Sequence, residues 1–529
     1  MDSNIVWNII DKYFENDKYN LVSHLLDSYN DFFETGLKNI FKEKNPIQIL
    51  KNQDPKTKDF NYSCKMYLGG KSGNKIYYGK PIIYDDVNTH YMYPNEARLR
   101  NMNYGFSIHY DVDVFFTIKT EGEEDFHHNF TLDKIFLGRF PVMLHSNLCI
   151  LKGLNRETCF NMGECKNDPG GYFIIDGKEK VIVCQEKFGD NMLYIRDKVD
   201  DKYSHAADIR CKSEDASKPV RTLSIRIVAK SAQFSNNQIV ISIPNVRKPV
   251  PLFIVFRALG IISDKDIISY CLLDLKKHSH LIDLFIPSVH DAGSIFTQET
   301  ALKYIALLTK GKTNAHVQEI LMNYLVPHMG ELNFREKAYY LGYIVYKLLR
   351  VFTKEDLPTD RDNFKLKRVE LPGTLLYDLF KEYYTIMQNM IFKKFDKIYY
   401  YHEGQYQDKK FINLVTLNYK DVFKERDLEL GFRRAFKGNW GAHSHTKREG
   451  IVQDLNRLSF NSSISHRRKM NLPMDASAKI IGPRLLHGSQ WGIIDPLDTP
   501  DGGNVGLHKH MSIVAKVTNG FSMYPMVKW

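Results

Sequence analysis

Residues 171–186 read GYFIIDGKEKVIVCQE, and they carry the strongest local structural signal in the chain. Two runs rich in β-branched and aromatic residues flank Asp176 and Gly177. An Asp-Gly pair suits a two-residue type I′ turn, because glycine adopts positive φ without steric cost. The segment therefore predicts a β-hairpin that turns at Asp176 and Gly177.

Further elements follow outward from this hairpin in both directions. Hydrophobic residues at helical spacing predict helices within 1–50, within 300–351 and, as one long helix, over 373–400. Pro251 is expected to open a helix that Gly260 closes, and Ser263 to cap the next helix in a capping box with Asp266. Strands are expected at 106–120, 221–229 and 238–243, with a solvated acidic turn at 121–129.

Two polar stretches divide the chain, which at 529 residues is long enough for about three domains. The first covers residues 197–218 and the second residues 353–365. Both are rich in Asp, Lys and Ser or Thr and poor in apolar residues, so we expect domain boundaries there.

Composition places the chain among globular proteins with a polyanionic partner. Hydrophobic residues make up 43%, which excludes a wholly disordered or fibrous chain. Seventy-three Lys and Arg against 62 Asp and Glu give a net charge of +11. No apolar run reaches the ~18 residues of a membrane span, and the acidic start is unlike a signal peptide, so we expect an intracellular protein without membrane partners. The seven cysteines, an odd number, are expected to be reduced thiols, and their spacing lacks the paired pattern of a zinc site.

Positive charge concentrates between residues 431 and 512. This stretch has twelve basic and six acidic side chains. Its net charge of +6 is more than half of the +11 of the whole chain. A solvated basic face is the plainer interpretation. The many glycines among these basic residues favour a surface that tracks a nucleic-acid strand, because glycine lets the backbone approach a ligand closely.

Three carboxylates lie close together at Asp495, Asp498 and Asp501. Carboxylates are ligands that Mg²⁺ prefers, so a metal-dependent nuclease is one hypothesis. Pairing of these aspartates with arginines, or a role in stabilising the loop, is the alternative.

Long collinear strings resemble the N-terminal part of the second-largest subunit of multisubunit DNA-directed RNA polymerases, the beta subunit in bacteria. The resemblance covers about residues 80–516 and is closer to the eukaryotic, archaeal and large-DNA-virus type than to the bacterial type. The strings are PNEARLRNMNY (94–104), FLGRFPVMLHSNLCIL (136–151), GECKNDPGGYFIIDGKEKVIVCQE (163–186), FIVFRALGIISDKDI (253–267), RDNFKLKRVELPGTLL (361–376), LNRLSFNSSISHRRKMNLP (455–473) and GPRLLHGSQWGIIDPLDTPDGGNVGL (482–507).

The resemblance implies an α+β, multidomain fold with protrusion, lobe and fork parts. Residues 1–188 would form the first segment of the protrusion and 189–362 the lobe. Residues 363–425 would form the second segment of the protrusion. Residues 426–529 would form the fork region, ending before the hybrid-binding and wall portions of the family, so the sequence resembles an N-terminal fragment. The Lys-, Asn-, Ile- and Tyr-rich composition suggests a large DNA virus.

The resemblance also implies a function, which is nucleotidyl transfer by an assembled DNA-dependent RNA polymerase. This chain would form one side of the DNA cleft and the fork loops beside the RNA–DNA hybrid, and would not be catalytically complete alone. The catalytic Mg²⁺ belongs to the largest subunit, so no cofactor is expected on this chain. The expected partners are the largest subunit, the C-terminal part of the second-largest subunit, other polymerase subunits, the DNA template and the hybrid. The expected location is the nucleus, or the virion or host cytoplasm if the source is viral.

Ten residues follow from matching the family's strings one by one. Asp498 and Asp501 match the two glutamates of the family's ETPEG string and are expected near the active centre. The expected nucleic-acid contacts are Lys447, Arg448, Arg457, Arg467, Arg468, Lys469, Arg484 and Lys509. The alternative is a fragment that binds nucleic acid or a partner and never assembles into a polymerase.

Overall fold

The computed structural model describes residues 3–15, 17, 19–53, 58–84, 88–119, 124–197, 199–213, 220–231, 237–444, 446–518 and 524–529. The described residues form two compact units, and the first is discontinuous, with residues 1–187 and 369–529. The second unit comprises residues 188–368. Both units mix helices with sheets in which the strand pairs are mainly antiparallel, and this confirms the α+β multidomain fold. The division into protrusion, lobe and fork parts stays a prediction.

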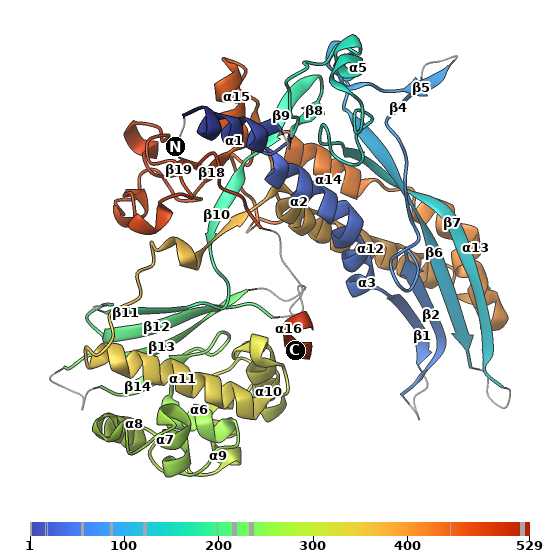
Figure 1. Cartoon of the computed structure of the whole chain (residues 1–529). Coiled ribbons are helices and arrows are strands. Elements are labelled where there is room, and N and C mark those ends of the chain that lie inside the picture. Colours follow the sequence, from blue (N-terminus) through green and yellow to red (C-terminus); the bar gives the residue numbers. More distant parts are fainter. Residues whose placement is uncertain are drawn as a thin grey trace. The chain divides into compact units, whose positions relative to one another are not determined.

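A five-stranded sheet dominates the first unit (Figure 1). Its central strand β6 pairs with β2 and β3, and also with β7. The pairing of β6 with β7 runs from Gly105 opposite Pro141 to Ile118 opposite Phe126. The expected turn at 121–129 is therefore partly wrong, because β7 begins at Phe126, and residues 120–123 lie outside the described part. The strands are β1 (Ile47–Gln53), β2 (Phe60–Leu68), β3 (Ile76–Tyr78), β6 (Gly105–Ile118) and β7 (Phe126–Pro141).

The long helix α12 (Pro372–Tyr401) confirms the prediction for 373–400 and organises the helices of this unit. It contacts α2, α13 and α14, and two glycines permit the close crossings. A Cβ on Gly373 would lie 1.9 Å from the Ser28 carbonyl oxygen, and one on Gly431 would lie 2.5 Å from the Tyr383 ring. The helices of the unit are α1 (Ser3–Glu15), α2 (Ser23–Asp31), α3 (Leu37–Lys44), α4 (Pro94–Leu99), α5 (Arg156–Asn161), α12, α13 (Asn413–Val422), α14 (Asp427–Phe436), α15 (Phe460–Arg467) and α16 (Tyr524–Lys528).

The hairpin predicted from 171–186 is present. Strands β8 (Phe173–Ile175) and β9 (Lys178–Ile182) flank Asp176 and Gly177, which both have positive φ, 49° and 75°. Strand β17 (Val452–Asp454) adds to β9. A second small sheet follows in the order β16 (Lys367–Glu370), β10 (Cys184–Phe188), β18 (Lys469–Asn471) and β19 (His508–His510). Through these pairings the hairpin segment is joined to the basic C-terminal part of the chain. Separately, β4 (Ile82–Tyr84) and β5 (Thr89–Tyr91) pair as a two-stranded ribbon.

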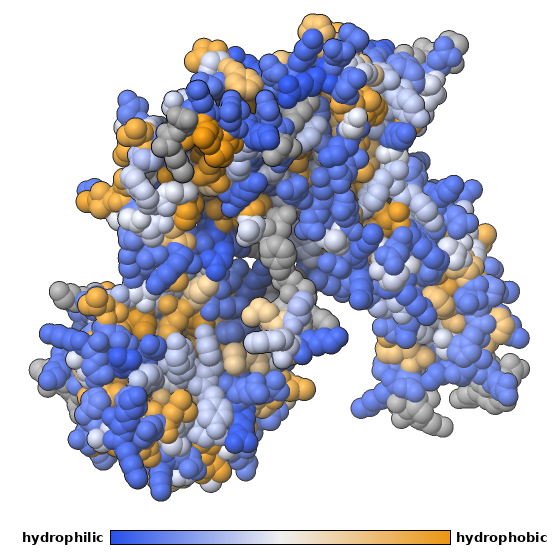
Figure 2. All heavy atoms as spheres, viewed as in Figure 1, coloured by the Kyte–Doolittle hydropathy of each residue, from blue (hydrophilic) through white to orange (hydrophobic). Residues whose placement is uncertain are grey.

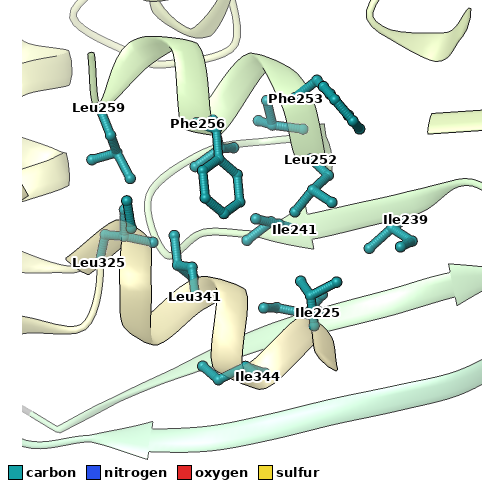
Figure 3. Packing of buried hydrophobic residues seen from close by; sticks show 14 of the residues in the cluster. Ile225, Ile239, Ile241, Leu252, Phe253, Phe256, Leu259, Leu325, Leu341 and Ile344 are labelled. Atoms are coloured by element: carbon teal, nitrogen blue, oxygen red, sulfur yellow. The ribbon is translucent and has the colours of Figure 1, made fainter. Parts of the chain in front are cut away.

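The second unit is an antiparallel sheet covered by helices, with one hydrophobic core (Figure 3). In that core Phe256 of α6 and Leu341 of α11 lie beside Ile241 of β14. The strands, in sheet order, are β11 (Leu193–Asp197), β12 (Tyr203–Cys211), β13 (Arg221–Val228), β14 (Ile239–Ser242) and β15 (Val250–Pro251). The helices are α6 (Leu252–Ala258), α7 (Asp264–Leu272), α8 (Ile286–Asp291), α9 (Gln298–Leu307), α10 (Asn314–Asn323) and α11 (Phe334–Phe352).

Two expectations in this unit are wrong. Residues 197–218 were expected to mark a domain boundary, but their described part contains β12, in which Ala206, Ala207 and Ile209 are buried, and the change of unit lies between residues 187 and 188. Small buried residues give a weak hydrophobic signal, so the strand is not evident from composition. Helix α7 begins after Ser263 as expected, but the Ser263 side chain makes no capping hydrogen bond.

No described helix of either unit is both long enough and apolar enough to cross a bilayer.

Candidate nucleic-acid interface

A buried ionic network holds the basic C-terminal segment onto the hairpin segment of the first unit. At its centre, the Asp168 carboxylate accepts hydrogen bonds from Arg467 Nη1 and Arg457 Nη2, each at 2.9 Å. Tyr172 Oη also donates to Asp168, at 2.9 Å, as does the Gly170 N–H, at 3.0 Å. Burial alone would raise the pKa of Asp168, but Arg467, the Gly170 N–H and Arg457 together lower it to about 2. Asp168 is therefore an ionised anchor at neutral pH.

Glu179 extends the same network on β9. It accepts hydrogen bonds from Arg457 Nε at 2.7 Å and from Arg98 Nε at 3.0 Å. Arg98 in turn donates to Glu164 at 2.7 Å and to Tyr172 at 2.8 Å. Sequence reasoning missed these partners. The only signal for them was a group of acidic residues in the string 163–186.

Arg467 is enclosed by this network. Its side chain has 0% exposure, and its remaining donors reach the Gly170 carbonyl at 2.7 Å and Ser463. The predicted contact of Arg467 with nucleic acid is not supported, because its side chain is fully buried and its Nε, Nη1 and Nη2 atoms each donate a hydrogen bond inside the protein.

Arg468 and Lys509 are also buried, with 4% and 6% exposure. The Arg468 guanidinium donates to the carbonyls of Leu21 at 2.7 Å and Ser512 at 2.5 Å. Lys509 Nζ lies 2.7 Å from the Glu186 carboxylate. These geometries run against the predicted nucleic-acid contacts of both residues and give them structural roles instead, because both side chains connect separate parts of the chain.

The other basic residues keep charge nearer the surface. Lys447 is exposed, and its described neighbours make no ion pair with it. Arg448 is 43% exposed and pairs with Glu370 at 2.9 Å. Arg457 is 42% exposed while it contacts Asp168 and Glu179. Lys469 is half-buried on β18, and burial lowers its pKa.

Arg484 joins three loops. Its guanidinium donates to the carbonyls of Ala476 at 2.8 Å and Gly503 at 2.6 Å, and also to Val505 at 3.1 Å. Gly506, the residue after Val505, has a φ of 72°. A Cβ at this position would lie 2.3 Å from the Arg484 carbonyl oxygen. Backbone carbonyls do not neutralise a guanidinium, so Arg484 leaves positive charge among these loops.

The aspartates of residues 495–501 are used differently from one another. Asp495 accepts hydrogen bonds from the N–H groups of Leu497 and Asp498, at 2.9 and 3.2 Å. Asp498 accepts from Ser465 Oγ at 2.8 Å and lies 3.2 Å from His510 Nδ1. Asp501 is exposed. Across the described ranges, no three His, Cys, Asp or Glu side chains are grouped closely enough to hold a metal ion, so the nuclease hypothesis has no geometric support there.

Hydrophobic side chains also lie exposed around this region. Figure 2 shows them on the face that carries α1 and the loops after α15. Trp491 is 79% exposed and Leu497 is 87% exposed, and Ile481, Leu485, Leu486, Ile513 and Val514 are exposed as well. An exposed apolar surface of this kind is typical of a face that another chain or domain covers.

Two protein-family models match parts of the sequence. The family model described as RNA polymerase beta subunit matches residues 20–417, and the model of RNA polymerase Rpb2, domain 3, matches residues 453–517. The second-subunit protein of DNA-directed RNA polymerase II from Arabidopsis thaliana is 32% identical, over 99% of this chain and 44% of that protein. Subunit RPB2 of the same enzyme from Encephalitozoon cuniculi is 34% identical, with the same coverages.

An archaeal relative has a different length. The DNA-directed RNA polymerase subunit Rpo2N of Methanothermobacter thermautotrophicus is 29% identical, over 97% of this chain and 95% of that protein. The chain thus spans less than half of the eukaryotic relatives and nearly all of the archaeal one. These relatives come from cellular organisms, so they lend no support to a viral source. The family matches cover most of this sequence, and the chain belongs to the RNA polymerase beta subunit family.

Proposed function

We propose that the chain is part of a DNA-dependent RNA polymerase, in which it forms one side of the DNA cleft and the fork loops beside the RNA–DNA hybrid. One observation carries the proposal. The glycine-rich segment matched by the Rpb2 domain 3 model is fixed to the hairpin segment by Asp168, Arg457 and Arg467, while Lys447, Arg448, Lys469 and Arg484 carry charge outside that network.

The buried ion pairs and the more exposed cations have separate roles, and this arrangement suits a surface that binds a polynucleotide. Phosphate contacts need positive side chains at defined positions, and those positions need a rigid support. The buried pairs supply the support, because a buried pair resists the loss of either partner. Lys447, Lys469 and Arg484, unlike Arg448 with its Glu370 partner, would then neutralise backbone phosphates and release counterions, which supplies affinity that does not depend on sequence.

The proposed reaction is nucleotidyl transfer by the assembled enzyme. The RNA 3′-hydroxyl attacks the α-phosphorus of an incoming nucleoside triphosphate, which forms a phosphodiester bond, breaks the bond to the β-phosphate and releases pyrophosphate; Mg²⁺ held by the largest subunit would supply electrostatic stabilisation of the charged oxygens. In this proposal the residues of this chain bind and orient the nucleic acid and hold no metal. The proposed location is the nucleus, by analogy with the RNA polymerase II relatives.

Assembly with the partner subunits tests the proposal. The chain would be co-expressed with the largest subunit and the C-terminal part of the second-largest subunit from the same source, and RNA extension measured on a primed template with Mg²⁺. We expect co-purification and extension that depends on this chain. A chain that binds nucleic acid but never co-purifies with the largest subunit would instead support the alternative of a fragment outside any polymerase.

A further inference from the structure

A cavity of about 280 Å³ opens in the first unit between the β6–β7 ribbon, the Asp176 turn and α14. It lies among residues that the proposed function does not use. Met92, Met102, Ile175, Phe140, Phe432 and Phe436 supply its apolar lining, and Arg139, Arg433, Glu429 and Asp176 supply its charged groups. Pockets with an apolar lining and a few polar groups are the usual form of binding sites.

The apolar lining of the cavity is closely packed. The rings of Phe140 and Phe432 pack edge to face with centroids 5.0 Å apart. Gly105 also lines the cavity, and a Cβ there would lie 2.7 Å from the Phe140 carbonyl oxygen. The cavity of about 280 Å³ beside this lining offers space for an apolar side chain.

The charged groups at this cavity are unequally satisfied. Asp176 pairs with Lys437 at 2.6 Å. Arg139 and Arg433 are both exposed, and neither forms an ion pair within the described residues. Arg139 instead lies over the Tyr84 ring, 5.3 Å from its centroid. Glu429 Oε2 is enclosed, and no donor from the described part of the chain reaches it.

From this arrangement we infer that the cavity binds an extended peptide segment of a partner protein, in which an apolar side chain is flanked by carboxylates. The apolar side chain fills the floor, and the carboxylates accept forked hydrogen bonds from Arg139 and Arg433.

Charge and shape both favour this occupant over others. A cationic segment would meet the two guanidinium groups, whose repulsion exceeds the attraction of one carboxylate. A polynucleotide would satisfy the arginines but has no aliphatic side chain for the floor. An extended peptide supplies the apolar anchor and the anionic groups together.

Fluorescence anisotropy with the full chain tests this inference. The probe is a fluorescein-labelled peptide with the central sequence Asp-Phe-Asp, and the comparison peptides carry Asp-Ser-Asp and Lys-Phe-Lys. We expect the first peptide to bind at least about ten-fold more tightly than either comparison. Equal binding of all three, or tighter binding of the Lys-Phe-Lys peptide, would overturn the inference.

Two neighbouring arginines provide matched variants. Arg433 and Arg434 are both exposed on α14, but only Arg433 lines the cavity. We expect Arg433→Glu to weaken the Asp-Phe-Asp peptide about ten-fold or more, and Arg434→Glu to change it less than about two-fold. Equal effects of the two variants would show non-specific charge attraction and overturn the inference.

Methyl NMR locates the bound peptide. With ¹³C-methyl methionine, we expect the Asp-Phe-Asp peptide to shift the resonances of Met92 and Met102, which line the cavity. Shifts confined to other methionines would place the peptide elsewhere and contradict the inference.

Discussion

Arg467 Nη1 lies 2.9 Å from Oδ1 of Asp168, although 299 residues separate the two in the chain. Both side chains are buried, so their pairing excludes water. Through this contact the segment of α15 and β18 is attached to the hairpin segment that also carries β8 and β9. The position of the proposed nucleic-acid surface thus depends on an interior ion pair.

Replacing Arg467 with Ala should detach this segment. Removing Arg467 takes away the buried guanidinium that faces Asp168 and leaves Arg457, which is 42% exposed, as the remaining ionic partner, so the cost is up to about 3–5 kcal/mol, that of a broken buried pair. Hydrogen exchange of the full chain should show lost protection in both 163–186 and 455–473. Arg434→Ala, at an exposed site on α14, is the control and should leave both segments protected. Unchanged exchange in Arg467→Ala would show that the pair does not hold the two segments together.

Gly506 should not tolerate a side chain. An Ala at this position would place Cβ 2.3 Å from the Arg484 carbonyl oxygen at a φ of 72°. Gly503 is the matched control, because a Cβ there meets nothing within 4 Å. In the assembled enzyme, Gly506→Ala should lower RNA extension about ten-fold or more while Gly503→Ala stays near wild type. Equal activities would contradict the role given to the close approach of Arg484.

Acid should loosen the same attachment through His24. This residue of α2 is buried, with Nε2 3.3 Å from the Arg467 carbonyl oxygen. Burial and then Arg468 lower its pKa from 6.5 to about 3. Below pH 6.5 the His24 side chain therefore takes up a proton in the unfolded chain but stays neutral in the folded chain. The contribution of His24 to the free energy of unfolding is fully present above pH 6.5 and is lost as the pH falls toward 3.

The measurement is hydrogen-exchange protection of residues 455–473 as a function of pH, after correction for the intrinsic exchange rate. In wild type we expect the opening free energy to fall by up to about 1.4 kcal/mol per pH unit below pH 6.5 from this one proton. His24→Gln should be less stable at pH 7 but should show a weaker pH dependence in this range. An identical pH dependence in both proteins would exclude His24 as its source.

Removing a surface cation should weaken nucleic-acid binding without unfolding the chain. Lys447→Ala and Lys469→Ala should each lower the slope of log affinity against log salt by about 1 in the assembled polymerase on a hybrid scaffold. Arg434→Ala should leave the slope unchanged. Unaltered slopes in both lysine variants would count against phosphate contacts by these residues.

Arg468→Ala is expected to lower the stability of the chain, although the sequence alone places Arg468 among the nucleic-acid contacts. The reason is that Arg468 is buried and donates to backbone carbonyls.

Strong local patterns made part of the fold predictable. The Asp176–Gly177 turn and the long helix α12 follow from turn chemistry and from helical spacing, which act within a few residues. Strand β12 was not predicted because its buried positions include Ala206 and Ala207, which add little hydrophobicity to a polar stretch of sequence.

The site was predictable only as a region. Counting charges identified residues 431–512 as a basic region. The sequence does not distinguish an arginine that faces solvent from one that forms an ion pair inside the protein. Arg467 is enclosed because Asp168 meets it from a distant segment, and that encounter depends on the tertiary fold. The sequence therefore could not separate the supporting cations from the exposed ones.

The most direct test is a cryo-electron microscopy structure of this chain assembled with its polymerase partners on a scaffold that contains an RNA–DNA hybrid. The account predicts that Lys447, Lys469 and Arg484 lie within hydrogen-bonding distance of backbone phosphates, while Arg467 stays paired with Asp168 away from the nucleic acid. A structure in which those three cations face solvent and the polynucleotide runs along another surface would contradict it.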